Sequence, residues 1–180
     1  MNLTGYSLFI QQALKYGFSL FGLPKTGQTI EYQAGDDGTY KKGYPKTGAR
    51  FTDNGDGTIT DRATGLMFVK DGTGAGCNNG IALDWSNAII FCEGLNFAGY
   101  TDWRLPNLQE LISLWDGSLT VAPIVDPTFF PNTRAANYYT STTRSNVTTW
   151  AITVNYAVGY QTLAAVLKTA SHYVRPVRGG

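Results

Sequence analysis

The chain has 180 residues, of which 43% are apolar and only 15% are charged. A core built from this many residues buries about 70% of the unfolded chain's surface, so the sequence predicts no cofactor and no structural metal. Fourteen Lys and Arg residues are balanced by 13 Asp and Glu residues, and the formal net charge is +1. Because no run of basic residues offsets this balance, the composition excludes the charge pattern of a nucleic-acid-binding protein.

The first segment, residues 1–22, is predicted to form an amphipathic helix. Within residues 4–21 the polar side chains fall on one narrow stripe, and apolar side chains cover the rest of the helix. A membrane span needs about 20 mainly apolar residues, so none is expected here. The segment also lacks the basic region and cleavage site of a secretory signal. The apolar face is expected either to pack on the chain's own domain or to mediate assembly.

Residues 23–49 are rich in Gly, Thr, Lys and Pro, which predicts an extended connector. A domain is then expected over residues 50–180. Near its start, residues 53–57 read Asp-Asn-Gly-Asp-Gly between two short β-prone runs, a pattern typical of a tight hairpin. Glycines stand where a calcium loop needs oxygen ligands, so a hairpin explains the turn better than a calcium site.

Two helices are expected in the middle of this domain. The first covers residues 84–95, with Asp84 as its N-cap and apolar residues along one face. The second covers residues 107–115, where Asn107 and Glu110 have the spacing of a capping box. A long loop with three prolines follows over residues 117–137.

Antiparallel strands are predicted for the end of the chain, over residues 150–156, 161–167 and 172–178. In residues 150–156, large side chains at the even-numbered positions alternate with smaller side chains at the odd-numbered positions. This alternation predicts one buried and one outward face. The buried face is expected to carry Trp150, Ile152 and Val154.

Several motifs, in this order, resemble the Lcl C-terminal domain family. They are PKTGQT (24–29), GDDG (35–38), RFTDNGDGT (50–58), TGLM (64–67), GYTDWRLPN (99–107), FFPNT (129–133), YYTST (138–142), Trp150 and VRPVRGG (174–180). The chain departs from the family pattern at Phe68, where Trp is usual, and at Tyr139 and Thr140, where Trp-Ser is commoner. These departures are conservative and leave the expected fold intact.

The resemblance implies an α+β, C-type-lectin-like fold with two helices and antiparallel sheets, preceded here by the N-terminal helix. Relatives include secreted adhesins, some of them trimeric, and retroelement-diversified or phage receptor-binding proteins. The resemblance therefore implies that the protein is located outside the cell, on the cell surface or on a virion. It also implies a glycan or protein ligand and a homo-oligomer. It also implies that Trp103 lies in the core and that Asp102 and Arg104 pair with each other.

The candidate ligand-binding residues are those expected to point away from the buried face of the terminal strands or to lie in their loops. Tyr156 and Tyr160 could serve as aromatic anchors or pack on a neighbouring loop. The set comprises Arg144, Ser145, Asn146, Thr148, Asn155, Tyr156, Tyr160, Gln161 and His172.

Cys77 and Cys92 are the two cysteines, and their spacing fits no zinc motif. They are expected to form a disulfide in an exported protein, and buried free thiols are the alternative. Formylglycine-generating enzymes, distant relatives by fold, use a redox cysteine pair. No base or electropositive pocket is evident around either cysteine here, so the sequence predicts a binding module and no catalysis. A structural subunit assembled through residues 1–22 is the remaining alternative.

Overall fold

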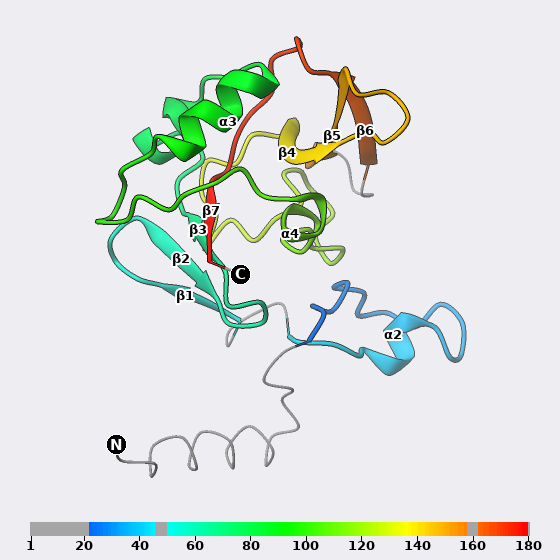
Figure 1. The fold of residues 1–180 in the computed structure, drawn as a ribbon. Helices are drawn as coiled ribbons and strands as arrows, with labels where there is room; N and C mark the ends of the chain where they lie inside the picture. Colours follow the sequence, from blue (N-terminus) through cyan, green and yellow to red (C-terminus); the bar gives the residue numbers. More distant parts are fainter. Residues whose placement is uncertain (1–21, 46–49, 158–161, 180) are drawn as a thin grey trace, which may run out of the picture.

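The computed structural model describes residues 22–45, 50–157 and 162–179, and the predicted helix over residues 4–21 lies outside this part. The described chain is an α+β fold with two antiparallel sheets (Figure 1). The predicted fold class is therefore confirmed.

The first sheet joins the beginning and the end of the domain. Its strands are β1 (Phe51–Asp53), β2 (Thr58–Asp61), β3 (Met67–Val69) and β7 (Val177–Arg178), in the order β1-β2-β3-β7. The predicted hairpin is confirmed, since β1 and β2 pair across a turn in which Gly55 and Gly57 adopt φ of +80° and +91°. The expected strand over residues 172–178 is wrong in length and place: only β7 forms, and it pairs with β3 rather than with the other terminal strands.

The second sheet consists of β4 (Asn137–Thr143), β5 (Trp150–Asn155) and β6 (Thr162–Leu167), in that order. The prediction of a single buried face on β5 is wrong. Ala151 and Thr153 are fully buried on one face, and Val154 is fully buried on the other. The reason is that the middle strand is covered on both sides, by α4 (Leu108–Ile112) and its cluster on one face and by α3 (Trp85–Glu93) on the other.

Both predicted helices form, and they begin where their caps stand. The Asp84 side chain accepts the amide hydrogen of Asn87 at the start of α3. At the start of α4, Asn107 and Glu110 form the predicted capping box. The last predicted turn of α4 is not helical, because the chain leaves the helix axis after Ser113 to enter the 114–136 loop.

The connector folds back on itself instead of running extended. Pro24 and Tyr44 form a bridge between its two ends, and a short helix, α2 (Asp37–Tyr40), lies between them. Asp36 fixes this loop, because its carboxylate accepts hydrogen bonds from the amides of Tyr32 and Thr39. Figure 1 shows the connector beside the domain, below α4.

Candidate functional site

The end of the second sheet farthest from the connector presents an exposed polar turn. This turn, residues 144–149, joins β4 to β5, and Ser145, Asn146 and Thr148 are exposed in it. Arg144 donates a hydrogen bond from Nε to Oδ1 of Asn146 at 2.9 Å. Its guanidinium carbon lies 5.5 Å from the centre of the Trp150 ring. The turn is thus held against an aromatic side chain.

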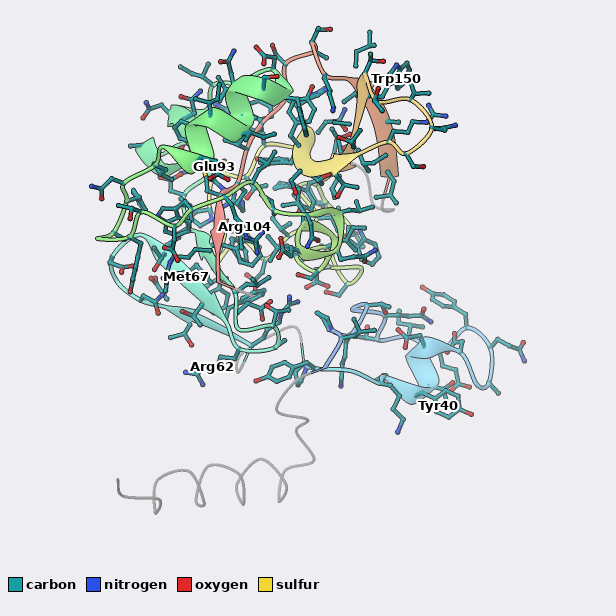
Figure 2. All side chains as sticks on the ribbon, viewed as in Figure 1. Tyr40, Arg62, Met67, Glu93, Arg104 and Trp150 are labelled. Carbon is teal, nitrogen blue, oxygen red and sulfur yellow. The ribbon has the colours of Figure 1, made fainter. Side chains whose placement is uncertain are left out.

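Next to this turn, one sheet face carries apolar side chains that the core does not cover. Trp150 pairs with Leu167 across the strands, and Ile152 pairs with Ala165. Leu163 and Leu167 are each 49% exposed, while the other three are half-buried. We call this surface the distal sheet face, and it comprises Trp150, Ile152, Leu163, Ala165 and Leu167. Figure 2 shows Trp150 at this end of the sheet, far from Tyr40 of the connector.

The distal sheet face continues directly into the main core. Val154 lies two residues beyond Ile152 on the same strand, so the two side chains point the same way. Val154 is fully buried in the cluster that contains Tyr138, Leu111 and Phe130. The same sheet face is therefore covered at Val154 in β5, whereas Leu163 and Leu167 of the neighbouring β6 remain exposed.

The opposite face of this sheet is closed. Tyr139 is buried against α3 and the His172 ring, whose centre lies 5.0 Å from the Tyr139 ring. Burial lowers the pKa of His172, which favours the neutral imidazole. His172, one of the predicted ligand-binding residues, is half-buried and lies on this face of the sheet, apart from Trp150.

Tyr156 is also a core residue and not a surface anchor. Its side chain is fully buried, and its hydroxyl donates a 2.7 Å hydrogen bond to the carbonyl of Leu111 in α4. Asn155 is half-buried and accepts the amide of Ala157 at 2.6 Å. It stands at the other end of β5 from Trp150, about 16 Å away at the usual rise per residue. Tyr160 and Gln161 lie outside the described residues.

The structure therefore brings together only part of the predicted set. Arg144, Ser145, Asn146 and Thr148 share one turn, and Trp150, expected to be purely structural, lies beside them at the surface. Sequence alternation predicted that Trp150 and Ile152 are buried with Val154, because it could not show which half of each face is covered by helices.

Asp102 and Arg104 do not pair with each other, which corrects the expectation for this segment. Asp102 binds the Arg178 guanidinium at 2.7 and 3.0 Å. Arg104 makes two 2.7 Å hydrogen bonds to the carboxylate of Glu110. The cause is the C-terminal strand, which pairs with Arg104 through Val177 and so carries Arg178 toward Asp102. Trp103, between them, is 1% exposed.

Cys77 and Cys92 are free thiols, so the expected disulfide is not present in the structure. They belong to separate clusters: Cys77 packs with Val69 and Trp103, and Cys92 packs with Ala88 and Tyr139. Burial raises the pKa of the Cys77 thiol to about 11 and that of Cys92 further still. Both sulfur atoms are therefore neutral at physiological pH, the reverse of what a nucleophile requires.

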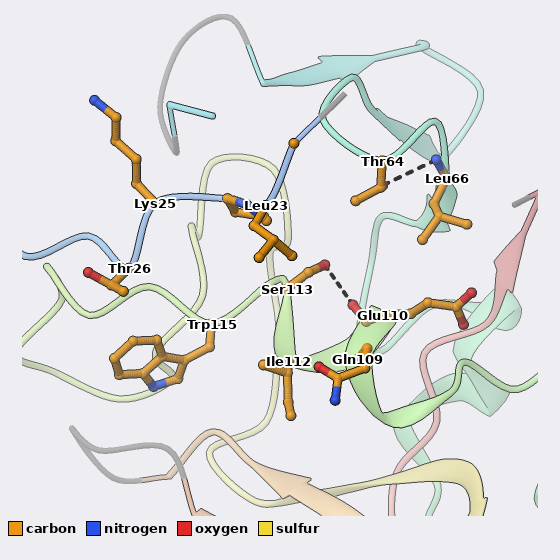
Figure 3. Close-up of a pocket in the computed structure, with 12 residues that line it drawn as sticks. Leu23, Lys25, Thr26, Thr64, Leu66, Gln109, Glu110, Ile112, Ser113 and Trp115 are labelled. Carbon is orange, nitrogen blue, oxygen red and sulfur yellow. Dashed lines mark hydrogen bonds between the residues drawn. The ribbon is translucent and has the colours of Figure 1, made fainter. Parts of the chain in front are cut away.

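A cleft that the sequence did not indicate lies between the connector and α4. It has a volume of about 500 Å3 and is bordered by Leu23 and Lys25 on the connector and by Leu66, Ile112 and Trp115 on the domain. Figure 3 shows the Trp115 indole below Thr26, with Leu23 above Ser113. No local pattern could reveal this cleft, because its two walls are about 90 positions apart in sequence.

Among the described residues, no helix is long and apolar enough to cross a membrane, and no three His, Cys, Asp or Glu side chains gather as a metal site would require. The fold and the distal sheet face define an α+β domain with an uncovered, aromatic sheet end. The chain belongs to the Lcl C-terminal domain family, whose sequence model matches residues 57–178. No curated protein sequence matches the chain.

Proposed function

We propose that this protein is a ligand-binding module of the adhesin or receptor-binding kind, displayed outside the cell or on a virion. The observation that carries the proposal is the distal sheet face, where two leucines remain 49% exposed beside a half-buried tryptophan. Membership of the Lcl C-terminal domain family is compatible with such a role. The ligand would be a surface glycan or a protein.

The composition of this surface suits recognition. Trp150 and the leucines offer rigid apolar contact area, since few rotatable bonds are frozen when such side chains bind. The adjacent turn adds short polar side chains and one guanidinium, which provide directional hydrogen bonds around the apolar centre. An apolar centre with a polar rim is the usual arrangement of a protein-binding surface.

The proposal includes no catalytic step. The buried, neutral state of Cys77 and Cys92 supports binding over a redox reaction of the formylglycine-generating kind. His172, whose pKa is lowered by burial, packs on Tyr139.

A screen against surface glycans and whole cells tests this function. We expect Leu167→Asp to reduce binding at least tenfold, because a charge replaces exposed apolar area beside Trp150 on the distal sheet face. Ile90→Asp is the matched control: Ile90 is 67% exposed, but it lies on α3, away from this face. Equal loss in both variants, or no loss in either, would place the binding surface elsewhere.

A second candidate function is that of a subunit in a larger assembly. The connector favours it, because Leu23, Ile30 and Tyr32 are 86%, 60% and 79% exposed there. Residues 1–22, predicted as an amphipathic helix, would provide further contact area. Sedimentation of the full chain and of a chain beginning at Gly22 tests this: identical oligomeric states would exclude assembly through that segment.

A further inference from the structure

A second cleft lies on the other side of Trp115, between the connector and the loop that follows α4. Its volume is about 480 Å3, within the range of about 300–1,000 Å3 typical of small-molecule sites. The connector supplies one wall, including Gln28, Tyr32 and Asp37. Trp115 and residues 117–120 supply the other wall, with Trp115 separating this cleft from the one in Figure 3.

Close backbone contacts fix the two walls relative to each other. The amide of Gly117 donates a 2.8 Å hydrogen bond to the carbonyl of Thr26. Gly27 has φ of +98°, and a Cβ atom at this position would lie 2.3 Å from Oδ1 of Asp116. The Asp116 carboxylate is buried and accepts both the amide and the hydroxyl of Ser118, at 2.9 and 2.8 Å. The cleft is therefore preformed and does not depend on a loop closing.

Polar groups with free hydrogen-bonding capacity border this cleft. The amide nitrogen of Gln28 donates to the carbonyl of Ile30 at 3.0 Å and to Asp36 at 2.8 Å. Those two bonds fix the amide, and its oxygen accepts no hydrogen bond from the described residues. One oxygen of Asp37 accepts the Thr26 hydroxyl, and the other accepts no hydrogen bond within residues 22–45, 50–157 and 162–179.

The electrostatic character of the cleft excludes several ligand classes. Among the described lining residues, Asp37 carries the one charge, and the other polar groups are amides and hydroxyls. A carboxylate repels anionic ligands such as phosphates or uronic acids. A purely apolar ligand would leave the Asp37 and Gln28 oxygens desolvated and unpaired, which disfavours its binding.

A neutral sugar ring satisfies all of these features. Its C–H face can lie against an aromatic ring, and its hydroxyls can donate to carboxylate and amide oxygens. Tyr32 supplies an aromatic surface on one wall, where its side chain is 79% exposed, and Trp115 borders the cleft on the other wall. We propose that this cleft binds one neutral hexopyranose unit of a glycan. This cleft and the distal sheet face are separate surfaces. A negative binding result at one of them therefore does not exclude binding at the other.

The indole N–H signals of the 15N-labelled full chain provide the test, because the chain has four tryptophans and each signal can be assigned by a Trp→Phe variant. The probes are maltotriose, cellotriose and N,N′,N″-triacetylchitotriose, each titrated separately, with tri-galacturonic acid as the anionic counterpart. We expect at least one neutral trisaccharide to shift the Trp115 signal saturably at millimolar concentration and to leave the Trp150 signal in place. The anionic trisaccharide should produce no shift.

Tyr32→Ala should weaken this titration at least fivefold, because it removes one aromatic surface of the cleft. The substitution is at an exposed side chain, so an unchanged remainder of the spectrum will verify the fold. Tyr40→Ala is the matched control: Tyr40 is 62% exposed in α2 and does not border the cleft. The proposal is overturned if no neutral trisaccharide shifts the Trp115 signal, if tri-galacturonic acid binds as well, or if Tyr32→Ala and Tyr40→Ala titrate alike.

Discussion

At the scale of single residues, the two cysteines show how burial determines chemistry. Cys77 is 2% exposed and Cys92 is fully buried, and both pKa values are raised. Since the thiolate is the reactive form, we expect a thiol reagent at pH 8 to react with the folded protein at least about 100-fold more slowly than with the protein in urea.

The number of thiols released in urea without reductant checks the bonding state. Two reactive thiols agree with the structure, whereas none would show that an oxidised form with a disulfide had been isolated. Sequence spacing alone left both states open, because a disulfide requires the two Cβ atoms to meet and that proximity depends on how α3 packs.

At the scale of secondary-structure elements, the capping box of α4 carries a pH-dependent contribution to stability. Burial alone would raise the pKa of Glu110, but hydrogen bonds from Arg104 and the Asn107 amide, with the charge of Arg104, outweigh it and lower this pKa. A carboxylate whose pKa is lower in the folded state than in the unfolded state stabilises the fold. The stabilisation is complete at pH values above the unfolded-state pKa of about 4.3, and it is lost as the pH falls through the folded-state pKa.

Glu110→Gln should therefore lower the free energy of unfolding by about 1 kcal/mol at pH 7, a modest amount because the pair is partly exposed to solvent. The difference in the free energy of unfolding between the variant and the wild-type protein should be smaller at pH 3. Urea unfolding at the two pH values measures it, with Glu31→Gln as the control, since Glu31 is exposed in the connector. A difference that is the same at both pH values would show that the carboxylate charge contributes nothing.

Elements defined by local signals could be predicted, and those defined by distant partners could not. Asp84 and Asn107 are local capping signals, and both helices begin where these residues stand. The partner of β7 is β3, more than 100 positions earlier, and no local pattern specifies that pairing. The same limit explains why Asp102 was assigned to Arg104 and not to Arg178.

At the scale of the whole molecule, the connector and the domain form one unit because two glycines allow their backbones to approach. Gly27 faces Asp116, and Gly117 lies so close to the connector that a Cβ atom there would be 2.9 Å from the carbonyl oxygen of Thr26. The sequence predicted an extended connector. The Gly, Thr and Lys residues of this segment form no local pattern that indicates which surface they contact. Both clefts beside Trp115 depend on this docking.

Gly27→Ala should release the connector without unfolding the domain. The added methyl group would meet the Asp116 carboxylate at 2.3 Å and the Ser118 amide at 2.7 Å, so the Gly117–Thr26 hydrogen bond must break. We expect trypsin to cleave after Lys25 about tenfold faster, because proteolysis follows the population of the locally opened state. Cleavage sites within residues 50–157 should keep their rates.

Gly35→Ala separates this clash from backbone strain. Gly35 also has a positive φ, +89°, so alanine there is strained by a similar amount, about 1 kcal/mol. Its Cβ atom would come no closer than 3.9 Å to another side chain, that of Tyr40. If both variants expose Lys25 equally, strain within the connector and not contact with Asp116 controls the docking. Faster cleavage in Gly27→Ala alone assigns the docking to the close approach at Asp116.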